Sequence, residues 1–166
     1  MTRLTNILGS ARVLRSDAGE KSTLGGCTDR FMIDGADSGG RFALVQQTLD
    51  PRALAAPVHR HHNEDEYTYV LSGRIGAILG GQEVFAEAGD FIFKPRNQWH
   101  TFWNAGNETA SVLEIISSAG LEELFRSFKD IPEPDPETLM AMAAAYGCDI
   151  DFEATMPIVE RHSLEF

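Results

Sequence analysis

The sequence has few cysteines, few basic residues and no long apolar run. Its only cysteines, Cys27 and Cys148, lie far apart and outside any C-x-x-C motif, which is more typical of reduced structural thiols than of a disulfide framework. The chain has 14 Lys and Arg residues and 25 Asp and Glu residues, which gives a net charge of −11. This acidity argues against nucleic acid or an anionic membrane as partner, because both attract clusters of basic residues.

No segment reaches the roughly 20 apolar residues that a membrane helix needs. The first residues carry polar or charged side chains too often to form the apolar stretch of a signal peptide. We therefore expect a cytoplasmic protein. With 166 residues, of which 43% are hydrophobic and 23% charged, the chain has the length and composition of one soluble domain with a single core.

Candidate metal ligands gather in the segment from Pro57 to Gly73, PVHRHHNEDEYTYVLSG. His59 and His61 are two residues apart, so in an extended strand their side chains point to the same face. Glu66 begins the β-branched and aromatic run that follows. These three side chains can converge on one point, and such a set predicts a metal site.

A second segment, Gly89 to Asn104, adds His100 after a turn rich in Gly, Pro and Asn. Three imidazoles and one carboxylate suit one divalent transition metal, namely Fe, Mn, Ni, Cu, Co or Zn. Mg and Ca prefer ligand sets made of oxygen alone. The expected cofactor is therefore a transition metal bound by His59, His61, Glu66 and His100.

The first segment resembles the first motif of the cupin superfamily, G-x5-H-x-H-x3-4-E-x6-G. His59, His61, Glu66 and Gly73 take the motif positions, with four residues between His61 and Glu66. The leading glycine of the motif is replaced by Ala53.

The second segment resembles the second cupin motif, G-x5-P-x-G-x2-H-x3-N. Gly89, Pro95, His100 and Asn104 match it, whereas Asn97 stands at the central glycine. Asn tolerates positive φ better than other non-glycine residues, so we expect Asn97 in a left-handed turn. Fifteen residues, 74–88, separate the motifs, as in compact microbial cupins, and the wider likeness is to the quercetin dioxygenase-like branch.

The resemblance implies an all-β fold, the cupin double-stranded β-helix or jelly-roll barrel. Short strands separated by Gly, Pro and Asn independently predict an antiparallel barrel or jelly roll. We expect N-terminal extension strands at residues 1–37, the barrel with both motifs at 38–118, and a C-terminal helical segment at 119–166, all within one structural domain.

Turn residues between the expected strands predict four hairpins. The strand pairs are Asp29–Ile33 with Arg41–Leu49, Tyr67–Leu71 with Arg74–Leu79, Arg74–Leu79 with Gln82–Glu87, and Trp99–Trp103 with Thr109–Ser117.

The apolar period changes to that of helices after Ala119. We expect a helix over 121–128 and a second that begins with Asp135 as N-cap and Pro136 at its first position and ends at Gly147. A last short helix is expected over 152–161. These helices either close one mouth of the barrel or cover a dimer interface.

Three residues are candidates for substrate binding. By analogy with the family, Gln46 lines the cavity, although alternation also allows two solvated glutamines at a sheet edge. Phe102 shares a face with His100 and is expected in the same cavity. Glu114 lies in an apolar strand, so it either points inward with a partner, as an acid or base beside the site, or sits at an exposed edge. Glu64 and Asp65 are expected in a loop facing water.

The leading hypothesis is a metal-dependent, dioxygenase-like oxidoreductase that acts on a small aromatic or enolic molecule, with Glu66 as metal ligand and proton acceptor. A cupin isomerase or decarboxylase with a redox-inert metal is one alternative. The other is a non-enzymatic module that binds a metal or small molecule, since fold does not fix function. The expected partners are a small-molecule substrate and a second copy of the chain in a homodimer.

Overall fold

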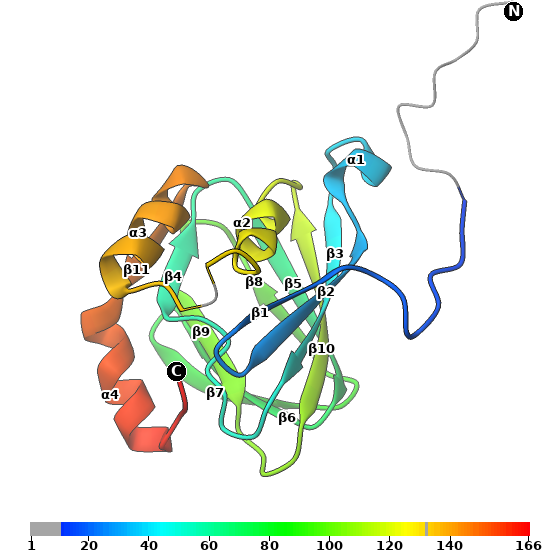
Figure 1. Cartoon of the computed structure of the whole chain (residues 1–166). Coiled ribbons are helices and arrows are strands. Elements are labelled where there is room, and N and C mark those ends of the chain that lie inside the picture. Colours follow the sequence, from blue (N-terminus) through cyan, green and yellow to red (C-terminus); the bar gives the residue numbers. More distant parts are fainter. Residues whose placement is uncertain (1–10, 132) are drawn as a thin grey trace, which may run out of the picture.

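The computed structural model describes residues 11–131 and 133–166, in which two antiparallel sheets face each other (Figure 1). One sheet has six strands, in the order β1 (Lys21–Leu24), β2 (Cys27–Ile33), β3 (Ala43–Leu49), β10 (Ala110–Ser117), β5 (Asp65–Ser72) and β8 (Phe91–Lys94). The other has five, in the order β11 (Cys148–Asp151), β4 (Val58–His61), β9 (His100–Asn104), β6 (Arg74–Leu79) and β7 (Gln82–Glu87). The prediction of an all-β jelly-roll barrel is confirmed.

Alternate residues of the central strands point into the barrel, because side chains along a strand alternate between the two faces. β3 and β10 both follow this rule throughout, and their buried positions are Ala43, Val45, Gln47, Leu49, Ala110, Val112, Glu114 and Ile116. One end of the interior is filled by apolar side chains, among them Leu49, Val70, Ile75, Val112 and Phe102. Polar groups gather toward the other end.

Helices close the polar end of the barrel. α2 (Glu122–Ser127) and α3 (Pro136–Ala145) pack with Phe31, Val45 and Ile116 of the six-stranded sheet (Figure 1). α3 starts as expected, with the Asp135 carboxylate accepting a hydrogen bond from the Thr138 N–H. Of the two roles foreseen for the C-terminal helices, α2 and α3 take that of closing the barrel mouth.

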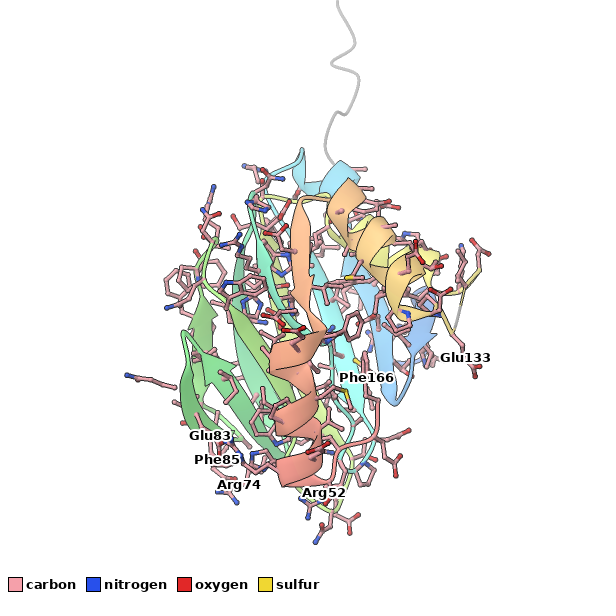
Figure 2. All side chains as sticks on the ribbon, turned by 90° about the vertical axis from the view of Figure 1, so that its left-hand side faces the viewer. Arg52, Arg74, Glu83, Phe85, Glu133 and Phe166 are labelled. Atoms are coloured by element: carbon pink, nitrogen blue, oxygen red, sulfur yellow. The ribbon has the colours of Figure 1, made fainter. Side chains whose placement is uncertain are left out.

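α4 (Phe152–His162) lies on the outside of the five-stranded sheet (Figure 2). Its Ile158 packs with Val58 and Trp103, which point away from the barrel interior. A short helix, α1 (Gly35–Ser38), joins β2 to β3. None of the helices in the described residues is long and apolar enough to cross a membrane.

Two of the four predicted hairpins are wrong. β5 pairs with β10 and β8, whereas β6 pairs with β7 and β9, so the chain crosses between the sheets at Gly73. Gly73 has φ of 83°, and a Cβ there would lie 2.7 Å from the Cβ of Ala110. β9 and β10 likewise belong to different sheets. The hairpins β2–β3 and β6–β7 are confirmed.

The C-terminal segment also contributes a strand that the sequence did not suggest. β11 pairs with β4, and Cys148 lies opposite His61. The boundaries predicted at residues 37 and 118 stay a prediction. Residues 1–10 of the predicted N-terminal extension, and Pro132 between α2 and α3, lie outside the described residues.

Candidate metal centre

Two strands of the five-stranded sheet and one strand of the six-stranded sheet bring the four predicted ligands together. β4 supplies His59 and His61, β9 supplies His100 and β5 supplies Glu66. One ligand atom from each of the four side chains lies within 4.8 Å of the others, and all four residues are buried. His59 and His100 are directly opposite each other, and they are the one pair that joins β4 to β9 in the ladder.

Backbone carbonyls orient two of the imidazoles. The Nδ1 of His59 lies 2.7 Å from the Pro57 oxygen, and the Nδ1 of His100 lies 3.0 Å from the Gln98 oxygen. A carbonyl can only accept, so each Nδ1 carries the proton and each Nε2 is left as an acceptor. The His100 Nε2 lies 3.2 Å from the Glu66 Oε2. Carbonyl contacts of this kind are the usual support of metal-binding histidines.

The turn before His100 has the geometry that the sequence predicted. Asn97 has φ of 64°, so it occupies the left-handed region where the family motif has glycine. Its N–H donates to the carbonyl oxygen of His61 at 2.7 Å. The turn therefore ties the segment that carries His100 to the strand that carries His61.

The three imidazoles of the cluster differ in their protonation. Burial, followed by the neighbouring imidazoles, lowers the pKa of His59 well below its usual value, and burial also lowers the pKa of His100. Burial alone would lower the pKa of His61, but the Glu66 carboxylate raises it to about 10. Both ring nitrogens of His61 are buried without a hydrogen-bond partner. His59 and His100 are therefore neutral, as metal-binding imidazoles must be, whereas His61 carries a proton and its Nε2 lies 3.4 Å from the Glu66 Oε2. A divalent transition metal would displace that proton and take its place beside the carboxylate.

Lys94 is a residue of the site that sequence reasoning missed. Its side chain is 1% exposed, and its Nζ lies 2.9 Å from the Glu66 Oε2 and 3.0 Å from the Glu114 Oε1. Both contacts are ion pairs without full hydrogen-bond geometry. Ile92 and Lys94 are two residues apart on β8, so their side chains point to the same, buried face of the strand. This spacing was the sequence signal that could have placed Lys94 inside the barrel. Burial would raise the pKa of Glu66, but Lys94 and then His61 lower it well below its usual value.

Glu114 points inward, which decides between the two orientations that the sequence left open. It is 1% exposed, and its Oε2 accepts a hydrogen bond from the Thr68 hydroxyl at 2.7 Å. Burial raises the pKa of Glu114 to about 7, against the opposing effect of Lys94. Two carboxylates therefore flank one ammonium group beside the imidazoles.

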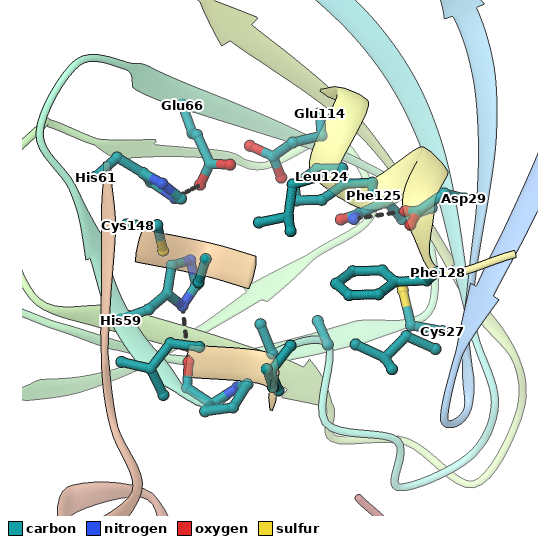
Figure 3. Close-up of a pocket in the computed structure, with 18 of the residues that line it drawn as sticks. Cys27, Asp29, His59, His61, Glu66, Glu114, Leu124, Phe125, Phe128 and Cys148 are labelled. Atoms are coloured by element: carbon teal, nitrogen blue, oxygen red, sulfur yellow. Dashed lines mark hydrogen bonds and ion pairs between the residues drawn. The ribbon is translucent and has the colours of Figure 1, made fainter. Parts of the chain in front are cut away.

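The cluster opens into a cavity of about 70 Å³ (Figure 3). His59, His61 and Glu66 line one side of it, and Phe102 lines it as expected. Apolar side chains of α2 and α3 cover the mouth, namely Leu124, Phe125, Phe128, Leu139 and Ala143. Cys27 and Cys148 are unpaired thiols and also line the cavity. The lining is mostly apolar, with polar groups at a few places, as is typical of small-molecule sites.

Two expectations about the lining are wrong. Gln47, and not Gln46, lines the cavity, because the inward phase of β3 falls on odd-numbered residues. Gln46 lies on the opposite face, where it contacts Arg30 and Ser111. Glu64 does not face water, since it is 6% exposed.

Two neighbours of the ligands face outward. Asp65 is partly exposed and forms an ion pair with Arg96 at 2.8 Å. His62 is exposed, as the strand alternation predicts, and lies 3.0 Å from Asp149. The two side chains therefore stay outside the ligand cluster.

The comparison with known proteins agrees with this geometry. A family model described as a cupin domain matches residues 45–116, which hold three of the four clustered side chains on β4 and β5 and the fourth on β9. The chain contains a cupin domain. The matched residues run from β3 to β10, whereas β1 and β2 precede them and α2, α3, β11 and α4 follow them.

Relatives of this cupin domain are distant. The tetracenomycin polyketide synthase protein TcmJ of Streptomyces glaucescens is 24% identical over 130 residues, which cover 78% of this chain and 87% of that protein. Quercetin 2,3-dioxygenase of Bacillus subtilis is 26% identical over 118 residues, 71% of this chain but 34% of that protein. The crystal structure of a predicted oxalate decarboxylase from Thermotoga maritima has 21% identity and a TM-score of 0.61, over 64% of this chain and 99% of that chain. The last likeness shows a shared fold.

Proposed function

We propose that the protein is a metal-dependent oxidoreductase of the dioxygenase type, acting on a small aromatic or enolic molecule that carries oxygen atoms. The observation that carries the proposal is the cluster of three imidazoles and Glu66 at one side of a cavity lined by aromatic rings. The distant similarity to a quercetin 2,3-dioxygenase supports this class of chemistry. Cytoplasmic location and a homodimer stay predictions.

His59, His61, Glu66 and His100 would hold one divalent transition metal. When bound, that metal would supply Lewis-acid and redox chemistry and lower the pKa of a substrate hydroxyl. The Nδ1 contacts of His59 and His100 with backbone carbonyls keep both rings turned for binding. Lys94 keeps Glu66 ionised, which is the form in which a carboxylate binds a metal.

Glu66 and Glu114 would share the handling of the substrate proton. Glu66 Oε2 accepts it from the substrate hydroxyl. The ammonium of Lys94, which contacts both carboxylates, then interacts more strongly with Glu114, the carboxylate that remains charged. Because the three groups are buried, this exchange keeps the local charge balanced without solvent.

The covered mouth would protect the reaction from water. Phe125, Phe128 and Leu124 of the α2 segment lie over the cavity, and Phe102 contacts the substrate from the barrel side. Removing water strengthens the interactions of Lys94 with both carboxylates.

Oxygen uptake tests the proposal. The protein is loaded with each candidate metal without air, mixed with flavonols, diketones or catechols, and then exposed to air. We expect oxygen uptake with at least one substrate, lost in a His59→Ala, His100→Ala variant and retained in His62→Ala, which alters an exposed histidine of the same segment. Conversion of a substrate without oxygen uptake would instead support an isomerase or decarboxylase, for which the predicted oxalate decarboxylase offers a fold precedent.

Glu66→Gln tests the proton acceptor. Three histidines can hold a divalent ion, so we expect most of the metal to stay bound while the rate falls by a factor of ~10²–10⁴. Glu114→Gln is the matched comparison, since it alters a carboxylate on the other side of Lys94. A wild-type rate in Glu66→Gln together with a loss in Glu114→Gln would transfer the acceptor role to Glu114. Binding without turnover by any loaded form would favour the non-enzymatic alternative.

A further inference from the structure

A second polar group lies in the cavity, away from the candidate metal centre. Asp29 on β2 and Gln47 on β3 are opposite each other in the ladder, and both side chains line the cavity. They are 5% and 7% exposed, so they are polar residues buried in a mostly apolar lining. Neither takes part in the chemistry proposed above.

The contact between the two side chains fixes the direction of the Gln47 amide. Its Nε2 donates to the Asp29 Oδ1 at 2.8 Å. The other end of the amide, Oε1, is buried and has no hydrogen-bond partner. An amide oxygen buried without a donor loses its hydration, and this is destabilising. A donor that reaches that oxygen would remove this cost.

The sheet register separates this pair from the metal centre. Gln47 lies opposite Val112 of β10, which lies opposite Val70 of β5, four residues beyond Glu66. Figure 3 shows Asp29 on the side of the cavity opposite His59 and His61, with Phe125 and Phe128 on that same side. A molecule that reaches both polar ends must therefore pass along apolar side chains.

We propose that Gln47 Oε1 accepts a hydrogen bond from a hydroxyl or N–H group at the far end of the substrate. The substrate class is then an aromatic molecule with metal-binding oxygen at one end and a hydrogen-bond donor at the other. Asp29 is a positioning residue, because it holds the Gln47 amide with its oxygen toward the cavity. The inference rests on the proposed function for the metal-binding end, whereas the donor end can be tested alone.

Two small probes of nearly equal shape test the donor end, 4-fluorophenol and 4-fluorotoluene. Their dissociation constants are measured by fluorine NMR with the full chain, and the quantity compared is the preference for the phenol over the toluene. We expect this preference to fall roughly 2- to 10-fold in Gln47→Met, the loss that one neutral hydrogen bond produces. Gln46→Met is the matched control, since Gln46 lies on the outer face, and it should leave the preference unchanged.

Asp29 variants separate positioning from packing. In Asp29→Asn the amide oxygen can accept the same bond from Gln47, so the preference should be kept. In Asp29→Leu the Gln47 amide is free to turn over, and the preference should fall as in Gln47→Met. Circular dichroism checks that each variant is folded.

An unchanged preference in Gln47→Met, or no millimolar binding of either probe to the wild-type chain, would overturn the inference. A loss of preference in Glu66→Gln alone would overturn it as well, because the phenol would then bind at the metal centre. None of these measurements depends on turnover or dioxygen. Failure of the oxidoreductase proposal is therefore distinguishable: it would leave the Gln47 effect in place and make the cavity a binding site for phenols.

Discussion

Both faces of the six-stranded sheet depart in part from the usual distribution of residues. The inner face buries charged and amide groups, namely Asp29, Gln47, Glu66, Lys94 and Glu114. The outer face of β5 and β8 exposes large apolar side chains: Tyr69 is 41% exposed, Leu71 41%, Phe91 56% and Phe93 49%. A sheet built for stability alone would bury the second set and expose the first. The buried polar groups and the exposed aromatic side chains are the two features of this sheet that stability alone does not explain.

Each face has its own physical cost. On the inner face, charges without partners would lose several kcal/mol of hydration each, so Lys94 between two carboxylates is what makes their burial tolerable. On the outer face, Tyr67 stacks on Phe93 with ring centroids 5.0 Å apart, which hides only part of the aromatic surface from water. Cover by a partner would remove this cost.

Lys94→Met should give the largest effect on the inner face. It keeps the length of the side chain but leaves two buried carboxylates without a cation, and we expect a loss of about 3–5 kcal/mol in unfolding free energy. Urea unfolding measures it. Lys129→Met, at an exposed ion pair, should cost less than ~1 kcal/mol. Adding Glu114→Gln to Lys94→Met should restore part of the loss, and equal losses for both lysines would disprove the role assigned to Lys94.

Removal of the metal should have the next largest effect. At a metal concentration about 100 times the dissociation constant, binding adds about 2.7 kcal/mol to the unfolding free energy. A His59→Ala, His100→Ala variant should contain no metal by elemental analysis and should unfold identically with and without a chelator. His62→Ala should retain the metal. Equal metal content in the double variant and the wild-type chain would refute the candidate metal centre.

Asp29 should make stability depend on pH. Burial raises its pKa to about 7, although the hydrogen bond from Gln47 opposes this, whereas an unfolded Asp titrates near 3.9. Between about pH 4 and pH 7 the folded chain therefore holds a proton that the unfolded chain has lost, so stability falls as pH rises, by up to about 1.4 kcal/mol per unit. In Asp29→Asn this contribution should vanish. Parallel pH profiles for the two proteins would contradict the burial of an acid there.

The outer face should give the smallest change in stability. Phe91→Ser with Phe93→Ser removes exposed rings, so each change should alter the unfolding free energy of the protomer by no more than about 0.5 kcal/mol. If a second copy covers this face, the double variant should sediment as a monomer where the wild-type chain sediments as a dimer. Phe85→Ser, on β7 of the other sheet, is a control with a similarly exposed ring. A wild-type chain that is monomeric at micromolar concentration would remove the dimer from consideration.

Local sequence signals predicted most of the fold. Short strands between turn residues indicated the barrel, and Asp135 with Pro136 located the start of α3. That β5 and β6 belong to different sheets could not be predicted in the same way. Ser72-Gly73 has the residues of a hairpin turn whether or not the strands on either side of it pair with each other. β11 was missed since Cys148–Asp151 is a strand only through its pairing with β4.

The metal ligands were predictable because their spacing matches a family motif, and the structure places all four together. The polar groups beside them were not. The alternation of side chains along a strand defines two faces but does not say which face points into the barrel. Gln46 was therefore predicted to line the cavity, whereas it is Gln47 that points inward. Lys94 escaped notice because a lysine in a strand normally faces water, and its burial depends on two carboxylates that come from other strands.

The sparse pairing of β4 sets the order in which the site can be completed during synthesis. β4 meets β9 through the His59–His100 pair alone, whereas β11 pairs with all four of its residues. Because β11 spans Cys148–Asp151, the strand that carries His59 and His61 keeps an open edge until some 90 further residues have left the ribosome. At 5–20 residues per second this is a wait of roughly 5–20 s. A nascent chain therefore exposes its two histidines to free metal ions well before the complete pocket exists.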